Sequence, residues 1–261
     1  MPRIVLVDAA GVLYLDTEAI PGAGAGIRYL KENGVRVFCV TNNTCQHPSL
    51  ITQMLAKKDV LFKEDEIISS GFGLQMDEEV HSLVSGKKIF VYGKDTSFFY
   101  IEAAGGHRVD RIEEAEAVVL TSTVDERHDI RFTMLRQSLA EHPRPVICSN
   151  PDRLVATPNG LDTVIGHDAA ILEADGIPVY WMGKPYPEFC HVVRKYLQKK
   201  GLVLGHADIF FDDNYHNVAM MAGTLGINGC LVHKTGISAG IPLEDLIPNP
   251  AVGYAVDSFC I

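Results

Sequence analysis

The chain has 261 residues, of which 47% are hydrophobic, and its formal net charge is −10. This length and hydrophobic content are enough for one large domain or two smaller ones, and they exclude a largely disordered chain. The acidic balance argues against nucleic acid and anionic membranes as partners, because both are bound through clustered Lys and Arg. A small ligand, even an anionic one held by a few local groups, remains compatible with this charge.

Neither a signal peptide nor a membrane span is predicted. Asp8 interrupts the first apolar run before it reaches the length of a signal-peptide core, and no apolar run approaches the roughly 20 residues that cross a bilayer. The six cysteines are scattered and form no CxxC pair, which favours reduced thiols in a cytoplasmic protein. They are Cys39, Cys45, Cys148, Cys190, Cys230 and Cys260.

The first 60 residues alternate between strand and helix patterns, which predicts a parallel sheet. Ligands of such sheets bind at the carboxyl ends of the strands. Asp8 and the Thr41-Asn42-Asn43 segment each follow a predicted strand, so we expect them to meet in one crevice. The predicted elements are a strand at 4–7, a helix at 23–33, a strand at 36–40 and a helix at 48–58.

A second set of elements occupies the middle of the chain, and the first pattern returns near Trp181. No Ser/Gly-rich linker separates the parts. We therefore predict an α/β fold in which a core of residues 1–72 and 180–261 carries an inserted α/β cap at residues 73–179. The predicted strands here are 88–92, 117–120, 145–148, 207–211, 229–233 and 254–256, and the predicted helices are 96–104, 130–141 and 187–200.

Carboxylates at the ends of buried strands are candidates for chemistry. Such a group can act as a nucleophile or as a ligand of Mg²⁺, which prefers one or two carboxylates among its oxygen ligands. Asp8 and Asp213 supply such a pair, and Lys184 could neutralise a bound phosphate. The alternative for any single aspartate is that it only begins a turn or caps a helix.

Four motifs in order strengthen the functional interpretation: DxxGVLY from Asp8, VTNNT from Val40, GKPYPEF from Gly183 and DDNYHNV from Asp212. Together they resemble the motifs of the haloacid dehalogenase superfamily, and more narrowly its NagD-type, nitrophenyl-phosphatase-like branch. SNPD at 149–152 resembles the cap segment TNPD of that branch, and YAVDSF at 254–259 resembles its usual ending. The resemblance covers nearly the whole chain.

The resemblance implies a Rossmann-like core with an inserted cap and Mg²⁺-dependent hydrolysis of a small phosphorylated metabolite. Asp8 matches the nucleophile that forms an aspartyl-phosphate, Thr41 and Asn42 match donors to the phosphoryl group, and Lys184 matches the lysine that holds nucleophile and phosphate together. Asp213 matches a magnesium ligand, joined by Asp8 and the backbone carbonyl of Ala10.

The cap is expected to close over the crevice, exclude water and select the substrate. Candidate substrate contacts are Gly11 and Asn43 beside the motifs, and Asn150, Asp152 and Arg153 from the cap. Caps of this branch often take part in dimers, so a homodimer is one expected assembly.

Three positions depart from the family pattern. Ala10 stands where the phosphatases have the aspartate that protonates the leaving group and then activates water, a contribution of typically 10²- to 10⁴-fold. Asn217 replaces an aspartate; it can still hydrogen-bond Lys184 but no longer offsets its charge. Asp212 stands where glycine is common.

Three explanations of Ala10 stay open at this point. The residue could be an engineered change that traps a ligand. It could be natural in an enzyme whose leaving group needs no acid, as in phosphonoacetaldehyde hydrolases, which have DxAGT. Lastly, the protein could be a non-catalytic phosphate-ligand-binding or regulatory relative.

Overall fold

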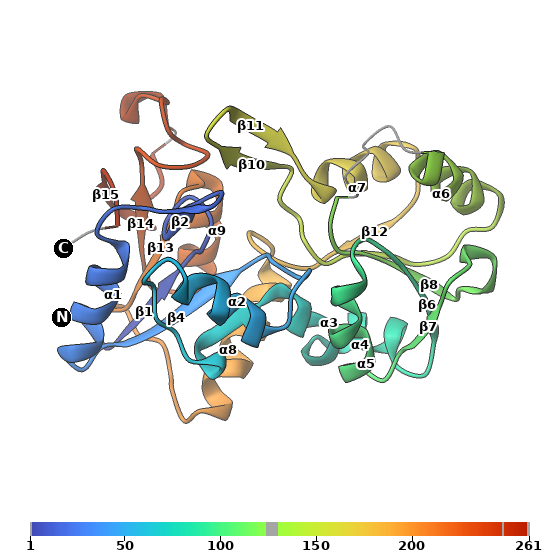
Figure 1. The fold of residues 1–261 in the computed structure, drawn as a ribbon, viewed down its shortest axis with the longest axis horizontal. Helices are drawn as coiled ribbons and strands as arrows, with labels where there is room; N and C mark the ends of the chain where they lie inside the picture. The colour runs from blue at the N-terminus through green and yellow to red at the C-terminus, as the bar shows by residue number, and fades with distance from the viewer. Residues whose placement is uncertain (1, 124–129, 247, 260–261) are drawn as a thin grey trace.

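The computed structural model describes residues 2–123, 130–246 and 248–259. Two parallel sheets form two lobes that lie side by side, and the first and last strands of the described chain, β1 (Ile4–Val7) and β15 (Val252–Val256), both belong to the first sheet (Figure 1). The chain enters the second lobe after residue 72 and returns near residue 182. This arrangement agrees with the predicted α/β fold, and we propose that the two lobes are the predicted core and cap.

The first sheet has six parallel strands in the order β15-β14-β13-β1-β4-β5. Because β1 pairs with both β13 and β4, the carboxyl ends of these three strands are neighbours. The strand β5 was not predicted, because its three residues give no periodic signal. The strands are β1 (Ile4–Val7), β4 (Arg36–Thr41), β5 (Ile67–Ser69), β13 (Ile209–Asp212), β14 (Asn228–Val232) and β15 (Val252–Val256).

Alternation along β1 directs side chains to both faces of the sheet, as a strand buried on two sides requires. Ile4 and Leu6 pack in one hydrophobic cluster with α8 and α9, whereas Val5 and Val7 pack in another with α1 and α2. Helices therefore cover both faces (Figure 1). They are α1 (Ala23–Glu32), α2 (Pro48–Ala56), α8 (Pro187–Lys199) and α9 (Tyr215–Leu225).

The second sheet has five parallel strands in the order β12-β9-β8-β6-β7. We predicted from the sequence that the strand near Trp181 belongs to the core, but β12 pairs with β9 in this second sheet. A short apolar strand does not reveal its partner, and the predicted boundary at 179/180 falls inside β12. The strands are β6 (Lys88–Tyr92), β7 (His107–Val109), β8 (Ala117–Leu120), β9 (Val146–Cys148) and β12 (Val179–Trp181), with helices α5 (Phe98–Ala103), α6 (Ile130–Glu141) and α7 (Ile165–Ala174).

Two antiparallel hairpins and several short helices complete the fold. The hairpin β10–β11 lies between the lobes, at the top of Figure 1, above the carboxyl ends of the first sheet. The sequence analysis did not predict either hairpin. The elements are β2 (Tyr14–Leu15), β3 (Glu18–Ala19), β10 (Leu154–Thr157), β11 (Gly160–Thr163), α3 (Gly73–Met76) and α4 (Glu78–Val84), with 3₁₀ turns at Glu64–Glu66, Ser70–Phe72, Asp95–Ser97, Ile112–Glu114 and Leu243–Asp245.

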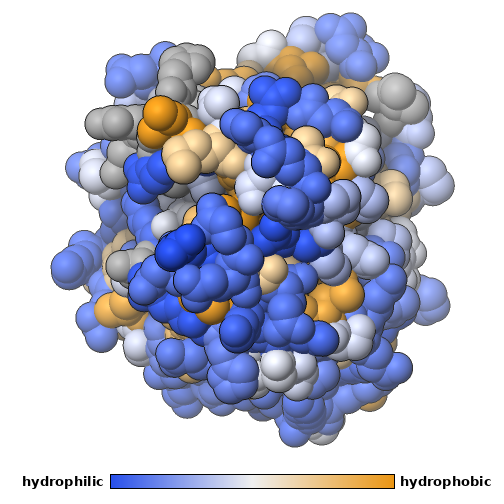
Figure 2. Space-filling view, turned by 90° about the vertical axis from the view of Figure 1, so that its right-hand side faces the viewer, coloured by the Kyte–Doolittle hydropathy of each residue, from blue (hydrophilic) through white to orange (hydrophobic). Residues whose placement is uncertain are grey.

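One hydrophobic cluster joins the lobes. It runs from Leu6 and Phe38 of the first sheet through Leu74 of α3 to Ile89 and Ile147 of the second sheet. Burial of this shared apolar surface favours a fixed arrangement of the two lobes. The outer end of the second lobe is mostly hydrophilic, with hydrophobic residues in small separate groups (Figure 2).

Two sequence expectations concern membranes and thiols. In the part of the chain that the structure describes, no helix has the length and apolar character needed to cross a membrane. Five of the six cysteines, all except Cys260, are free thiols in the structure. Cys260 lies outside the described residues, so the prediction for that thiol stays untested.

Candidate active site

Three of the predicted site residues, Asp8, Thr41 and Asp213, lie with Asp212 at neighbouring strand ends of the first sheet. Asp8 directly follows β1 and its backbone N–H donates to the carbonyl of Phe211, 2.8 Å away, in β13. Thr41 ends β4, Asp212 ends β13 and Asp213 follows it. The parallel topology therefore brings together side chains that are far apart in the sequence.

Lys184 lies between two of these carboxylates. Its Nζ is 2.6 Å from Oδ1 of Asp8 and 2.7 Å from Oδ2 of Asp212, and its side chain is 1% exposed. Burial by itself lowers the pKa of the ammonium group, but Asp212 and Asp8 outweigh this effect and raise the pKa of Lys184 above its usual range. Lys184 is therefore a fixed positive charge beside Asp8.

Asp213 is held in a space that two glycines leave open. The backbone N–H of Ile237 donates to its Oδ2 at 2.6 Å. Gly11 and Gly236 both have positive φ angles, 80° and 99°, and a Cβ on either would lie 2.3 Å or 2.0 Å from the same Oδ2. Only glycine permits this approach of backbone to carboxylate at both positions. The absence of a Cβ at Gly11 thus leaves space for the Asp213 carboxylate.

The loop of residues 235–238 is a part of the site that the sequence analysis missed. Besides Ile237, it contributes the hydroxyl of Thr235, which donates to the carbonyl of Gly11 at 2.6 Å, and the N–H of Ser238, which donates to the carbonyl of Asp213 at 3.1 Å. The feature of the sequence that could have indicated this loop is Gly236, which lies four residues beyond the end of β14, where ligand-binding loops occur.

The donor set fits a hard divalent cation. Asp8, Asp212 and Asp213 are buried, and one carboxylate oxygen of each lies within 4.8 Å of the others. The oxygens of Asp212 are engaged, Oδ2 with Lys184 and Oδ1 with the N–H of Asn214 at 2.9 Å. Asp8 and Asp213 remain as the pair of carboxylates that Mg²⁺ commonly uses.

The raised pKa values of Asp8 and Asp213 also favour a bound cation. Burial raises the pKa of Asp213 well above its ordinary value, and the charges of Asp212 and Asp8 raise it further. Burial also raises the pKa of Asp8, partly offset by Lys184. Three buried carboxylates share one ammonium group, so the site as described carries excess negative charge that a bound cation would neutralise.

The Asn42 side chain connects the lysine segment to the second lobe. Its Oδ1 accepts from the backbone N–H of Lys184 at 2.8 Å, and its Nδ2 donates to the carbonyl of Lys184 at 3.0 Å and to Oδ1 of Asp152 at 2.9 Å. Thr41 accepts from the N–H of Asn43 at 3.1 Å through its Oγ1, whose own proton is a donor. These contacts fix the positions of Lys184 and Asp152 relative to each other.

Asn43 and Asn150, both predicted to contact substrate, use their side chains within their own loops. Oδ1 of Asn43 accepts from the N–H of Cys45 at 3.0 Å, and its Nδ2 donates to Gln46 at 3.2 Å. Oδ1 of Asn150 accepts from the N–H of Asp152 at 3.2 Å. Neither asparagine lines the two cavities at the site, so substrate contact by either stays a prediction.

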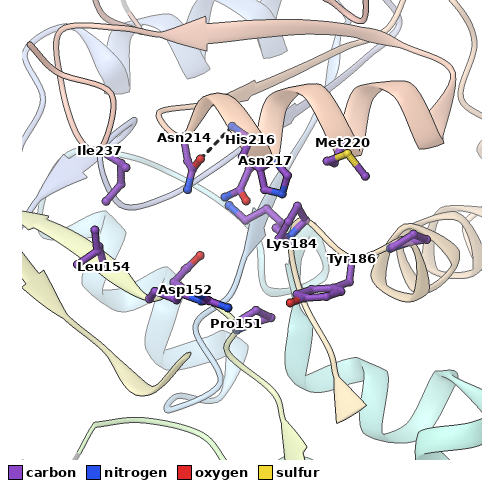
Figure 3. Close-up of a pocket in the computed structure, with 13 residues that line it drawn as sticks. Pro151, Asp152, Leu154, Lys184, Tyr186, Asn214, His216, Asn217, Met220 and Ile237 are labelled. Carbon is purple, nitrogen blue, oxygen red and sulfur yellow. Dashed lines mark hydrogen bonds between the residues drawn. The ribbon is translucent and has the colours of Figure 1, made fainter. Parts of the chain in front are cut away.

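A cavity of about 450 Å³ opens beside Lys184 (Figure 3). Residues 151–154 line one side and α9, through His216, Asn217 and Met220, lines the other. The guanidinium carbon of Arg153, a predicted substrate contact, lies 6.0 Å from the centroid of the Trp181 ring. Arg153 and Asp152 both line the cavity, and substrate contact by either stays a prediction.

Ala10 and Asn217 lie at the site as departures from the family pattern. Ala10 lines a small cavity together with Asp8 and Asp213. Nδ2 of Asn217 contacts Asp212, 3.4 Å from each carboxylate oxygen, rather than Lys184. The charge of Lys184, which the sequence left without its second partner, is offset by Asp212 instead. Side-chain pairing of this kind follows from packing and could not be read from the motif.

Comparisons with known proteins agree with this fold. Residues 5–107 match the family model described as haloacid dehalogenase-like hydrolase. The acid sugar phosphatase of Staphylococcus aureus is 24% identical over 246 residues, which cover 94% of this chain and 90% of that protein. The p-nitrophenyl phosphatase from Archaeoglobus fulgidus has a TM-score of 0.79 at 21% identity and covers 99% of this chain and 97% of its own.

A further solved structure, NagD from Escherichia coli K-12, has a TM-score of 0.75 at 21% identity over 99% of this chain and 97% of its own. The match to haloacid dehalogenase-like hydrolases thus covers residues 5–107, and the similarity to the acid sugar phosphatase extends over nearly the whole chain. The fold of the chain is similar to the folds of NagD and of the p-nitrophenyl phosphatase. The predicted Rossmann-like core with a cap is thereby confirmed.

Proposed function

We propose that the protein is a Mg²⁺-dependent phosphatase that hydrolyses a small phosphorylated metabolite through an aspartyl-phosphate on Asp8. The observation that carries this proposal is the convergence of Asp8, Lys184 and Asp213, with Nζ of Lys184 2.6 Å from Oδ1 of Asp8. The chemistry needs a carboxylate nucleophile, a fixed cation and a metal-binding carboxylate in one place. The match of residues 5–107 to haloacid dehalogenase-like hydrolases supports the same reaction class.

In this mechanism Asp8 attacks phosphorus through the oxygen that Lys184 does not hold. Two of the three ammonium protons of Lys184 face Asp8 and Asp212, so the third is available to a phosphoryl oxygen. The hydroxyl of Thr41 is placed at the same strand ends and would donate to another. These contacts stabilise the negative charge that develops on the phosphoryl oxygens.

Asp8, Asp213 and the backbone carbonyl of Ala10 would hold the magnesium ion. When bound, Mg²⁺ neutralises phosphate charge and orients the phosphoryl group toward Asp8. The alanine side chain does not prevent this, because the proposed ligand at residue 10 is the main-chain oxygen. Gly11 and Gly236 contribute by leaving the space in which Asp213 is held.

The proposed substrate class is a sugar phosphate or a metabolite of similar size. The name of the Staphylococcus aureus relative supports this class, and the cavity of about 450 Å³ beside Lys184 is within the usual range for small-molecule sites. Arg153 and Asp152 would contact the substrate from the proposed cap. A cytoplasmic location and a homodimer remain part of the proposal as drawn from the sequence.

A second candidate function rests on Ala10. Since no side-chain acid is present at residue 10, a non-catalytic phosphate-binding relative, or a hydrolase of an atypical leaving group such as a phosphonate, would have the same first motif. In either case the Asp8, Lys184 and Asp213 contacts would still hold the phosphoryl or phosphonyl group. A hydrolase of either kind forms a phosphorylated Asp8, whereas a non-catalytic binding relative does not.

The test is turnover of p-nitrophenyl phosphate and a panel of sugar phosphates with and without Mg²⁺, in the native chain, Asp8→Asn and Ala10→Asp. We expect Mg²⁺-dependent release of phosphate that Asp8→Asn abolishes, and an acid-stable phosphoenzyme that forms on Asp8. If neither the native chain nor Ala10→Asp turns over any compound and Asp8→Asn binds phosphate as tightly as the native chain, the protein is a binding relative.

A further inference from the structure

Two cavities meet at the proposed active site. The smaller, about 30 Å³, is lined by Asp8, Ala10 and Asp213, and the larger, about 450 Å³, opens beside Lys184 and is lined by α9 and residues 151–154. Five residues line both cavities and therefore mark the junction between them: Asp152, Leu154, Asn214, Asn217 and Ile237. Among these five, Asp152 alone has an ionisable side chain.

The position of the junction indicates where the leaving oxygen of a substrate would lie. If phosphorus is attacked by Asp8, the phosphoryl group occupies the smaller cavity and the rest of the substrate occupies the larger. The oxygen that bridges phosphorus to the leaving group then lies between them. A proton donor for that oxygen must face the junction, and Figure 3 shows Asp152 directed into the cavity opposite Asn214 and Asn217.

Asp152 is held in place by groups that also hold Lys184. Its Oδ1 accepts from Nδ2 of Asn42 at 2.9 Å, its N–H donates to Asn150, and Asn42 is bonded to the backbone of Lys184 on both sides. The hydrogen bonds of the described residues engage Oδ1 of Asp152 only, which leaves Oδ2 to face a ligand. This is the geometry of a carboxyl group with one fixed and one available oxygen.

We propose that Asp152 is the general acid and base of this enzyme, in place of the side chain that Ala10 lacks. The proposal rests on the proposed phosphatase function and assigns the proton transfers of that reaction to a residue of the second lobe. It also explains how the first motif can contain alanine in an active enzyme.

The proton and electron changes balance in two steps. In the first, the Asp8–phosphorus bond forms as the bond from phosphorus to the leaving oxygen breaks, and the Asp152 carboxyl gives its proton to that oxygen. In the second, the Asp152 carboxylate takes a proton from water, whose oxygen bonds to phosphorus as the Asp8–phosphorus bond breaks. The products are an alcohol, inorganic phosphate and the starting protonated Asp152.

The environment of Asp152 suits this role. Loss of hydration raises its pKa to about 6, an effect that Lys184 and the Asn42 hydrogen bond reduce and Asp212 increases. The charge of Asp152 in turn raises the pKa of Asp8. A carboxyl group with a pKa near the working pH can both donate and accept a proton.

His216 is the competing proton donor. It lines the larger cavity but not the smaller one, and its side chain is exposed. By this geometry it faces the leaving group at a greater distance from the bridging oxygen. His216→Gln therefore serves as the comparison for Asp152→Asn, which retains an oxygen that accepts from Asn42 but cannot transfer a proton.

Phenyl phosphate and p-nitrophenyl phosphate provide matched probes, because they differ mainly in the basicity of the leaving oxygen. The value of kcat/KM reports the first step, and only phenolate requires substantial protonation. We expect Asp152→Asn to lower kcat/KM for phenyl phosphate by about 10²-fold or more and that for p-nitrophenyl phosphate by less than about tenfold. We also expect Asp152→Asn to give a stoichiometric burst of p-nitrophenolate, because hydrolysis of the phosphoenzyme slows.

A second measurement uses Ala10→Asp. In the Asp152→Asn background, Ala10→Asp should restore most of the activity toward phenyl phosphate, because an aspartate at residue 10 supplies the proton that Asp152 no longer gives. Rescue of this kind identifies a shared role.

Defined results would overturn the assignment. Equal losses for the two probes in Asp152→Asn would mean that Asp152 only positions other groups, and an unchanged rate would exclude it altogether. A leaving-group-dependent loss in His216→Gln alone would assign the proton to His216. If the native chain hydrolyses neither probe and forms no phosphoenzyme, the proposed phosphatase function itself fails, which separates that outcome from the others.

Discussion

Lys184 and Asp212 form an ion pair inside the molecule, with Nζ 2.7 Å from Oδ2 and side-chain exposures of 1% and 0%. The family pattern that the motifs resemble has glycine at position 212 and a carboxylate at position 217, where this chain has Asn217. The two departures therefore compensate each other. Relative to that pattern, one negative charge has moved by five residues, from position 217 in α9 to position 212 at the end of β13, and still faces the same ammonium group.

The first prediction follows from this pair. Asp212→Asn removes one of two counter-charges of a buried lysine, so we expect the free energy of unfolding to fall by about 3 kcal/mol and kcat to fall with it, because Lys184 is no longer held on both sides. Moving the carboxylate back, in Asp212→Asn/Asn217→Asp, should recover most of both losses. Urea unfolding and p-nitrophenyl phosphate kinetics measure the two effects.

The single variant Asn217→Asp is the control for this exchange. It adds a carboxylate beside Asp212 without removing one, and like charges in a buried site repel. We expect it to be less stable than the native chain in the absence of Mg²⁺. A double variant that is as impaired as Asp212→Asn would show that the charge at 212 does not act through Lys184.

The second prediction concerns magnesium and Asp213. Mg²⁺ that binds only the folded protein should stabilise it, by about 2.7 kcal/mol at a hundred times its Kd. Asp213→Asn should lose this gain, yet in EDTA it should be more stable than the native chain, because it removes a buried charge that Asp212 and Asp8 oppose. Thermal unfolding with and without Mg²⁺ tests both statements.

Asp212→Asn supplies the comparison, because the oxygens of Asp212 face Lys184 and the N–H of Asn214 rather than a metal position. This variant should retain a stabilisation by Mg²⁺. If Asp213→Asn retained it instead and Asp212→Asn lost it, the metal would lie on the lysine side of the site.

Much of the fold and of the site was predictable for one physical reason. An apolar run that ends in a carboxylate, as Ile4–Val7 ends at Asp8, marks a buried strand and its functional end at once, and β1, β6 and β8 have the predicted bounds. Parallel topology then requires the ends of neighbouring strands to lie together. For this reason Asp8, Thr41 and Asp213 could be grouped before any coordinates were known.

The remainder depended on tertiary packing. The sequence of the strand Val179–Trp181 has no feature that assigns it to one sheet rather than the other. The role of the loop around Gly236 becomes evident only from its contact with the Asp213 carboxylate. The pairing of Lys184 with Asp212 depends on side-chain directions that a motif does not contain. The junction of the two cavities at Asp152 likewise exists only once the second lobe is in place.

The third prediction compares two glycines of the same stretch. Gly236 and Gly240 have φ angles of 99° and 84°, so alanine at either costs backbone strain of about 1 to 3 kcal/mol. A Cβ at Gly236 would lie 2.0 Å from Oδ2 of Asp213, whereas a Cβ at Gly240 would meet no atom within 4 Å. We expect Gly236→Ala to lose activity and the stabilisation by Mg²⁺.

Gly240→Ala should lose stability alone and respond to Mg²⁺ as the native chain does. Thermal unfolding in EDTA and in Mg²⁺ distinguishes the two variants, with p-nitrophenyl phosphate hydrolysis as the activity measure. Equal behaviour of both alanine variants would show that the space beside Asp213 is not needed for metal binding.

The fourth prediction is a pH dependence of stability that originates from Asp152. Burial raises its pKa from 3.8 to about 6 in the folded protein, in spite of Lys184 and Asn42. Between these two pH values the folded protein binds the proton more tightly than the unfolded chain does, so the contribution of Asp152 to the free energy of unfolding falls as pH rises from about 4 to about 6. Above that range the loss is complete.

Asp152→Asn cannot ionise and should escape this loss while still accepting the hydrogen bond from Asn42. The free energy of unfolding of the variant minus that of the native chain, measured by urea unfolding in EDTA, should therefore increase between about pH 4 and pH 6 and then level off. Taking the difference cancels the titration of carboxylates that the two chains share. A difference that is constant with pH, or that decreases, would mean that the pKa of Asp152 is not raised in the folded protein.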